Sequence, residues 1–224
     1  MYQGALGGAV VYGSKKMVYN FHKNENLHML WSAKLVNAAG VSIIENAASN
    51  RNIWEHWHIH IGFNRIELET KGEFRVRYKV LPVALLGTII PATKGRFSFK
   101  YSMQTLTPIF ISENKIDAAF SKRMVNGEAL VNSIIIKRSE YNRVIAHELL
   151  HTYQYDDYTY IDILFSKSKN KTRHKKWSKW IHIDIPSYFI HGSLYLLENK
   201  NRNCYFDNYF EREANFYSNK YLCP

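Results

Sequence analysis

Two histidines separated by three residues, His147 and His151, constrain the fold of this chain more than any other feature. They lie in a segment, residues 140–155, that contains neither proline nor glycine and has an apolar packing face. Residues four apart lie on one face of a helix, so both imidazoles can reach a single metal ion. Glu148, next to the first histidine, can accept a proton from a water molecule at that metal. The segment therefore predicts a Zn²⁺ site on a helix, with Glu148 as the catalytic residue.

The alternative for this segment is a core helix with two buried histidines and a solvated glutamate. Residues 147–151 form the pattern HExxH, in which x is any residue. Roughly two or three in a hundred random chains of this composition would contain it. The pattern has the apolar flanks Val144, Ile145 and Leu149, and a glutamate motif follows further along the chain. Neither feature is expected by chance. These features favour the metal site.

A catalytic zinc needs a third protein ligand. The best candidate lies in residues 210–215, Phe-Glu-Arg-Glu-Ala-Asn, at the start of a helix expected over residues 211–221. Glu211 and Glu213 point about 200° apart around a helix, so only one of them can face the metal. Helical spacing alone does not decide whether Glu211 or Glu213 is the third ligand.

At this point the sequence resembles the gluzincin class of zinc metallopeptidases. In that class an HExxH helix precedes a second helix with a glutamate ligand, often followed by a small residue and an aspartate. Glu211, Ala214 and Asn215 match this frame, so the resemblance implies Zn²⁺ held by His147, His151 and Glu211. Asn215 stands where the family has an aspartate that orients a metal-bound histidine, and an amide oxygen holds that histidine less firmly.

The resemblance covers about residues 131–221, whereas residues 1–130 match no family pattern. It implies a zincin-like fold, in which the strand expected over residues 131–137 is the edge strand that pairs with a substrate backbone. It also offers His191 or Tyr195 as the group that stabilises an oxyanion, although lone residues of these types are more often structural.

The function implied is that of a zinc-dependent hydrolase, a peptidase in which metal-bound water activated by Glu148 attacks a peptide carbonyl. The alternative is a non-catalytic binding or assembly protein of the cell envelope that retains a structural or vestigial zinc site. Asn215 and the unmatched first half keep this alternative open. A catalytic zinc retains a water position, whereas a structural zinc is closed by a fourth protein ligand.

A second group of potential metal ligands lies at His56, His58 and His60, which share one face of an expected strand. Neighbouring residues on the same face of a strand are about 7 Å apart. Two of these histidines could therefore bind one metal ion, but binding by all three would strain the strand. The alternative is the polar face of a strand, and a second zinc per chain would argue against it.

Three polar residues follow the histidines of the HExxH helix. The pair Asp156 and Asp157 either lies on the surface or orients a ligand histidine. Gln154 is expected to be a surface or capping residue.

The order of elements is helix, then sheet, then helices, which predicts an α+β fold. We expect a loosely held glycine-rich start, residues 1–20, and an amphipathic helix over residues 27–48. Strands are expected over residues 56–68, 74–81, 96–103, 108–112 and 131–137, and further helices over residues 158–166, after Pro186 and over residues 211–221. The strand over residues 74–81 alternates, which predicts one buried face. We divide the chain into a segment of residues 1–50 and a zincin-like metallopeptidase domain of residues 51–224.

The formal net charge of +11 is concentrated in residues 165–180, which contain seven lysines and arginines and no acid. This block is either a solvated loop or a site for an anionic partner. Trp177 and Trp180 favour an anionic membrane surface, and nucleic acid is unlikely because no nucleic-acid-binding pattern accompanies the block. A membrane-spanning helix needs about 18 uncharged apolar residues in a row. No run in the sequence reaches this length, so no membrane span is expected. The N-terminal residues form a poor signal peptide, because no basic region precedes their weakly apolar stretch. The sequence therefore leaves the compartment of the protein unknown. The two cysteines, Cys204 and Cys223, allow one disulfide or two free thiols.

Overall fold

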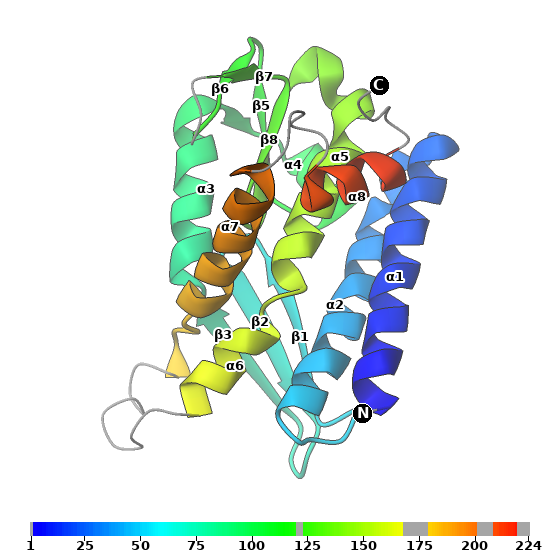
Figure 1. The fold of residues 1–224 in the computed structure, drawn as a ribbon, viewed down its shortest axis with the longest axis vertical. Helices are drawn as coiled ribbons and strands as arrows, with labels where there is room; N and C mark the ends of the chain where they lie inside the picture. The colour runs from blue at the N-terminus through cyan, green and yellow to red at the C-terminus, as the bar shows by residue number, and fades with distance from the viewer. Residues whose placement is uncertain (1, 120–122, 168–178, 201–207, 219–224) are drawn as a thin grey trace.

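The computed structural model describes residues 2–119, 123–167, 179–200 and 208–218. Two long helices open the chain and run side by side in opposite directions: α1, Tyr2–Lys23, and α2, Leu30–Ala48, joined through a short 3₁₀ helix, Leu27–Met29 (Figure 1). The expectation that residues 1–20 are loosely held is therefore wrong. A Cβ atom on Gly7 would lie 2.9 Å from the carbonyl oxygen of Gly40, so the two helices touch backbone to backbone. This close contact offsets the poor helix propensity of glycine.

The helical segment of residues 27–48, which ends with α2, is the one described helix that is long and apolar enough to cross a membrane, and an 18-residue window within it has a mean hydropathy of 1.3. Its charged residues Lys34 and Glu45 are nevertheless fully buried and paired with other side chains of this protein. Length and composition alone are weak evidence for a membrane span, and these buried ion pairs are those of a helix packed inside the protein.

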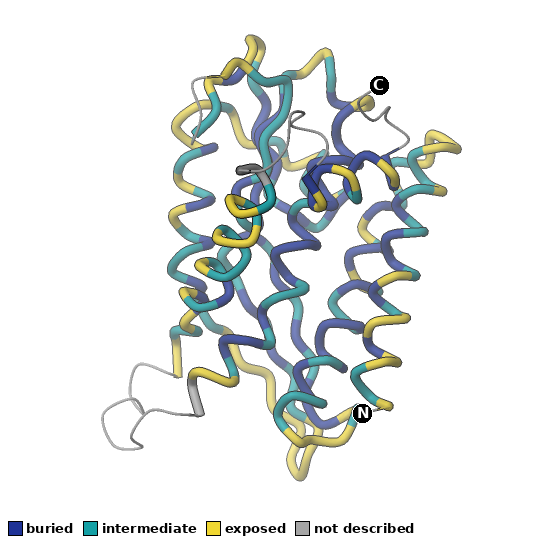
Figure 2. Tube along the Cα trace, viewed as in Figure 1, coloured by how far each residue is buried: buried dark blue, intermediate teal, exposed yellow. Residues whose placement is uncertain are grey.

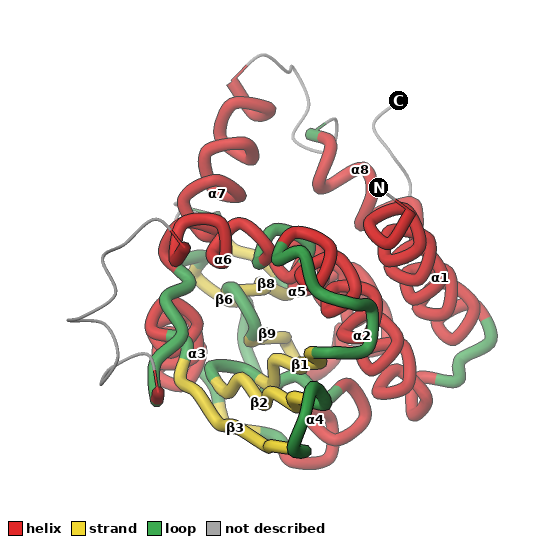
Figure 3. The backbone as a smooth tube through the Cα atoms, turned by 90° about the horizontal axis from the view of Figure 1, so that it is seen from below, coloured by secondary structure: helices red, strands yellow, loops and turns green. Residues whose placement is uncertain are grey.

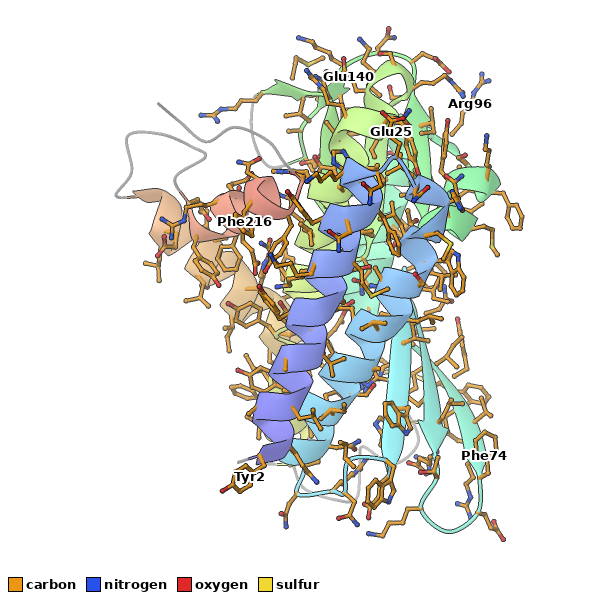
Figure 4. All side chains as sticks on the ribbon, turned by 90° about the vertical axis from the view of Figure 1, so that its right-hand side faces the viewer. Tyr2, Glu25, Phe74, Arg96, Glu140 and Phe216 are labelled. Carbon is orange, nitrogen blue, oxygen red and sulfur yellow. The ribbon has the colours of Figure 1, made fainter. Side chains whose placement is uncertain are left out.

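The first sheet is an antiparallel meander of β1, His56–Ile61, β2, Asn64–Glu69, and β3, Arg75–Val80. Helix α2 packs on β1, which has alternating buried residues. The expected buried face of the third strand is not observed, because Val76 and Tyr78 are 62% and 44% exposed. This strand is an edge strand, and Figure 4 shows Phe74 near the turn that precedes it, at the far end of the molecule from Glu140.

The second sheet has the strand order β4-β5-β9-β8. Its strands are β4, Arg96–Phe97, β5, Ile109–Ser112, β8, Gly127–Leu130, and β9, Ser133–Lys137. A separate two-stranded hairpin consists of β6, Ile116–Asp117, and β7, Met124–Val125. The expected strand over residues 96–103 is wrong after its first two residues, because helix α4, Phe99–Thr105, follows. Helix α3, Pro82–Lys94, was not expected.

The strand before the HExxH segment is not at the edge of this sheet. It is β9, which pairs in parallel with β5 on one side and antiparallel with β8 on the other. The prediction that residues 131–137 form the edge strand is therefore wrong, and β8 is the edge strand on that side.

The last helices surround the centre of the molecule. They are α5, Tyr141–Asp156, preceded by a 3₁₀ turn, Arg138–Glu140, then α6, Tyr160–Lys167, α7, Ile185–Lys200, and α8, Tyr209–Tyr217. Figure 2 shows α5 as the most continuously buried helix, running through the middle of the fold. Its apolar face packs with Ile134 and Ile136 of β9 in the main core. The α+β class with mainly antiparallel sheets is thus confirmed. Cys204 and Cys223 lie outside the described residues.

Candidate metal centre

Three side chains from two helices converge on one point. His147 and His151 lie one turn apart on α5, and Glu211 lies in the first turn of α8. The two Nε2 atoms of the histidines are 3.0 Å apart, and they lie 3.3 and 3.5 Å from the carboxylate oxygens of Glu211. The sequence predicted this group, and the structure brings all three together.

The start of α8 is fixed locally, which places Glu211. The Asn208 side chain accepts a hydrogen bond from the backbone N–H of Phe210 at 2.8 Å and so caps the helix. The same side chain donates to the backbone oxygen of Tyr195 on α7 at 3.0 Å. The Tyr195 hydroxyl in turn donates to Oε1 of Glu211 at 2.8 Å. Tyr195 therefore orients the carboxylate of the third ligand.

These separations fit a zinc ion. Bonds of about 2.0–2.1 Å from zinc to nitrogen or oxygen, in tetrahedral geometry, place neighbouring ligand atoms about 3.3–3.4 Å apart. The three observed separations, 3.0–3.5 Å, lie close to this value, with a different carboxylate oxygen of Glu211 beside each histidine. Two imidazoles and one carboxylate are also a donor set used by catalytic zinc sites.

Glu211 gives the group a negative charge, and without a metal this charge holds a proton on His151 that a zinc ion would displace. Burial works against charge on His151, but the attraction and hydrogen bond of Glu211 outweigh it and raise the pKa of His151 to about 9. Burial likewise opposes ionisation of Glu211, yet His151 and His147 hold its pKa well below the usual range. The carboxylate is thus charged and faces positive charge even without a metal.

Gln154 belongs to the candidate site, which the sequence did not predict. It was expected on the surface or at a cap, but it is buried, and its Oε1 lies 2.8 Å from Nδ1 of His151. Its amide nitrogen donates to the backbone oxygen of Phe210 and to Oε2 of Glu213. Gln154 therefore fixes the ring of one ligand and joins the two helices. The spacing of three residues from His151 was a signal that could have identified it.

Glu213, the other candidate ligand, points away from the metal group. Its Oε1 accepts from Lys15 of α1 at 3.0 Å, and Lys15 also pairs with Asp157 at 2.7 Å. Asn215 is buried, and within the described residues neither of its side-chain polar atoms has a hydrogen-bond partner. The orientation of a ligand histidine, expected from Asn215, is provided by Gln154 instead.

Glu148 lies on the inner side of α5, where it is buried. The edge strand β8 passes close to it: a Cβ atom built on Gly127 would lie 3.0 Å from Oε1 of Glu148. Only a residue without a side chain leaves this carboxylate its observed position. Gly127 is a second residue that the sequence analysis missed, because its role depends on how the strand packs against the helix.

His191 lies beside the metal group on α7, with its ring 4.9 Å from that of Phe210 and 5.5 Å from that of Tyr158. Burial, with a smaller effect of His151, lowers the pKa of His191 to about 4. It is therefore a neutral imidazole near neutral pH. Its Nε2 has no hydrogen-bond partner among the described residues.

The aspartates after the HExxH segment do not orient its histidines. Asp156 is buried and pairs with Lys34 of α2 at 2.6 Å and with Nδ1 of His60 at 2.9 Å. Asp157 pairs with Lys15 of α1. Both therefore join α5 to the first half of the chain.

The second histidine group forms part of this buried network. His56, His58 and His60 all point to the buried side of β1, and one ligand atom each of His56, His58 and Glu45 lie within 4.8 Å of one another. Arg65 lies in the same cluster. It donates to Glu45 at 2.7 and 3.2 Å and to Nε2 of His60 at 2.9 Å.

Arg65 also donates to Glu67 at 2.7 Å. A metal ion bound to Glu45 would stand beside this guanidinium and compete with it for the same carboxylate. The hydrogen bonds of the described residues thus explain the cluster as a buried ion network that holds β1 and β2 against α2.

No protein-family model, no curated protein and no solved structure matches this chain.

Proposed function

We propose that this protein is a zinc-dependent peptidase of zincin-like fold, related in its site to the gluzincins. The observation that carries the proposal is the convergence of His147, His151 and Glu211: the two Nε2 atoms are 3.0 Å apart, and each lies within 3.5 Å of one carboxylate oxygen of Glu211. A zinc ion held by them would lower the pKa of a water molecule and polarise a carbonyl group.

The protein's own residues divide the remaining work. Glu148 takes a proton from the attacking water and passes it to the amine that leaves. Gln154 and Tyr195 hold His151 and Glu211 in place through the hydrogen bonds described above. His191, neutral and beside the ligands, is placed to donate a hydrogen bond to an oxyanion.

The substrate would bind along β8. This strand ends its sheet on the side of α5, and an edge strand can pair with an extended peptide through backbone hydrogen bonds. Gly127, at the start of β8, lies against Glu148, so a peptide paired with this strand would run past the catalytic carboxylate. A peptide is therefore a better match to this site than a compact small molecule.

Metal analysis with a peptide-library assay tests the proposal. We expect one zinc per chain, together with cleavage of mixed peptides that a chelator abolishes and zinc restores. A protein that binds zinc without cleaving any peptide would favour the non-catalytic alternative. A second zinc per chain would contradict the assignment of His56 and His58 to the ion network.

The first mutational prediction concerns Glu148. Glu148→Gln keeps the shape of the side chain and removes only the proton acceptor. We expect zinc to stay at one per chain and turnover to fall by at least about a hundredfold. Near-normal turnover in this variant would refute the proposed mechanism.

The second prediction separates the ligand from its neighbour. Glu211→Ala removes one of three ligands, so zinc should be lost on dialysis against a weak chelator. Glu213→Ala leaves all three ligands in place and should retain zinc under the same conditions. The reverse result would show that the α8 helix presents a different face to the metal.

A further inference from the structure

Two lysines are buried in the part of the chain that the structure describes, Lys15 of α1 and Lys34 of α2. Most of the basic block, residues 165–180, lies outside the described residues, so the anionic partner expected there stays a prediction. Lys34 pairs with Asp156, whose carboxylate also contacts His60. The contacts of Lys15 lead to the metal centre instead.

Lys15 is the first member of a chain of hydrogen bonds that ends at a metal ligand. Its Nζ donates to Oε1 of Glu213 at 3.0 Å and to Asp157 at 2.7 Å. Oε2 of Glu213 accepts from Nε2 of Gln154 at 2.9 Å, and Oε1 of Gln154 lies 2.8 Å from Nδ1 of His151. Three side chains, from α1, α8 and α5, thus connect the first helix of the molecule to His151.

Helices α1 and α8 also pack against each other beside this chain of bonds. Nζ of Lys16 lies 5.4 Å from the ring centre of Phe216 and 5.9 Å from that of Tyr217. The ring of Tyr12 meets the ring of Tyr217 edge to face at 6.3 Å. Figure 1 and Figure 3 both show α8 beside α1. Helix α1 therefore supports the helix that carries Glu211.

Each bond of the chain has one possible direction. Burial opposes the charge of Lys15, but the neighbouring carboxylates outweigh it and raise the pKa of Lys15 above its usual value, so this ammonium group can only donate. The Glu213 carboxylate beside it can only accept. The backbone oxygen of Phe210, which Gln154 contacts at 2.8 Å, is likewise an acceptor. The atom of Gln154 that faces these two oxygens must therefore be the amide nitrogen, and the amide oxygen faces His151.

The orientation of this amide decides which nitrogen of His151 is free. An amide oxygen can only accept a hydrogen bond, so Nδ1 of His151 carries a proton. Nε2 of the neutral ring then has the lone pair that a metal ion needs, and Nε2 is the atom that lies beside His147 and Glu211. With the amide reversed, Nδ1 would have to accept and the proton would move to Nε2.

We propose that Lys15 and Glu213 are positioning residues, which hold the amide of Gln154 in the one orientation that leaves Nε2 of His151 available to zinc. The inference rests on the proposed zinc site but not on the peptidase activity. Neither Lys15 nor Glu213 supplies a ligand atom. Their effect is on the affinity for zinc, and they exert it through the tautomer of His151.

The variant Glu213→Gln tests the direction of the bonds. Lys15 needs an acceptor, so it would attract the amide oxygen of the new side chain and turn its amide nitrogen toward Gln154. Two amide nitrogens would then face each other, which favours the reversed amide of Gln154 and the wrong tautomer of His151. We expect zinc affinity, measured by competition with a chelator, to fall by about tenfold or more. Glu213→Ala should lose less affinity, because the backbone oxygen of Phe210 still holds the amide.

A second substitution should restore binding. When Lys15→Met is added to Glu213→Gln, no cation attracts the amide oxygen at position 213, so this oxygen can turn to Gln154. The double variant should therefore recover most of the lost zinc affinity. Urea unfolding of the zinc-free chains should give the opposite order, because the double variant has also lost the buried lysine. A merely structural role of Lys15 would lower stability and zinc affinity together.

The matched control is Lys34→Met. Lys34 is buried like Lys15 and pairs with Asp156, the neighbouring aspartate of α5, at 2.6 Å. Asp156 leads to His60 rather than to a candidate ligand of the metal centre. We expect Lys34→Met to lower stability and to bind zinc as the parent does. A comparable loss of zinc affinity in this control would make the effect one of stability and would overturn the proposal.

The zinc-loaded parent offers a test without substitution. Nitrogen NMR of its histidines should show His151 protonated at Nδ1 and bound to zinc through Nε2. Binding through Nδ1 would overturn the proposal, as would a Glu213→Gln variant with the affinity of the parent or a double variant that binds no more tightly than the single one. A parent that binds no zinc would refute the proposed metal centre as well, so the two failures are distinguishable.

Discussion

At the scale of single residues, Gly127 has the most specific consequence for the proposed chemistry. A methyl group at this position would meet the Glu148 carboxylate at 3.0 Å, and the flexible glutamate rather than the strand would move. Small displacements of a catalytic group are costly to the rate. Gly127→Ala should therefore lower turnover by about tenfold or more. Zinc content should stay at the parent level, because no ligand moves, and a parallel loss of zinc would show that the change disturbs the whole centre.

The sequence predicted some residues of the site and missed others for a physical reason. His147, His151 and Glu148 are related by one helical turn, so local geometry alone determines their arrangement. Gln154 and Gly127 act through contacts between elements far apart in the chain, Gln154 with α8 and Gly127 with α5. The spacing of Gln154 from His151 is a local signal, but the contacts of Gln154 with α8 and of Gly127 with α5 depend on packing that no local pattern encodes.

At the scale of elements, two errors in the sequence analysis share a cause. The three isoleucines at 134–136 are consecutive rather than alternating, which is the pattern of a strand covered on both faces. The resemblance pointed to an edge strand, whereas the residues themselves indicated the interior position that β9 occupies. In α1, the glycines were read as flexible, yet Gly7 is buried where α2 approaches. The positions of β9 and α1 are thus determined by the elements that pack against them.

The packing of α1 on α2 gives a prediction with an internal control. Gly7→Ala places a methyl group 2.7 Å from Ile44 and 2.9 Å from the backbone of Gly40. Overpacking of this kind should destabilise the protein by about 1–2 kcal/mol. Gly8→Ala in the same helix meets nothing within 4 Å and should stabilise it by about 0.5–1 kcal/mol. Thermal unfolding of the two variants measures both effects, and a destabilised Gly8→Ala variant would contradict the observed packing.

At the scale of the whole molecule, buried ion pairs unite the two halves of the chain. Lys15 and Lys34, from the helices that open the sequence, pair with Asp157 and Asp156 at the end of α5, the helix with two of the candidate metal ligands. Removing one member of a buried pair leaves an uncompensated charge, which is strongly destabilising. The first fifty residues therefore help to hold the candidate metal centre in place, although its three candidate ligands all lie in the second half of the chain.

One buried acid should make stability depend on pH. Asp162 on α6 is 3% exposed and accepts hydrogen bonds from the backbone N–H and the hydroxyl of Ser187 at the start of α7. Burial outweighs these bonds and, with repulsion from Asp184 and Glu45, raises the pKa of Asp162 to about 7. A folded-state pKa above the unfolded value means that the folded chain holds the proton more tightly. The contribution of Asp162 is therefore fully present below about pH 4 and is lost as the pH rises through about 7.

The variant Asp162→Asn carries an amide in place of the protonated acid and should remove this dependence. A pKa raised from 3.8 to about 7 corresponds to roughly 4 kcal/mol at most. In metal-free protein, urea unfolding should show the variant gaining a few kcal/mol over the parent between pH 4.5 and 8, with most of the gain below pH 7. The exposed residue Asp117 provides the control, because Asp117→Asn should follow the parent at every pH. Titrations common to parent and variant cancel in the difference. Parallel curves for Asp162→Asn and the parent would mean that the Asp162 carboxylate is ionised in the folded protein without cost, and that water reaches the junction of α6 and α7.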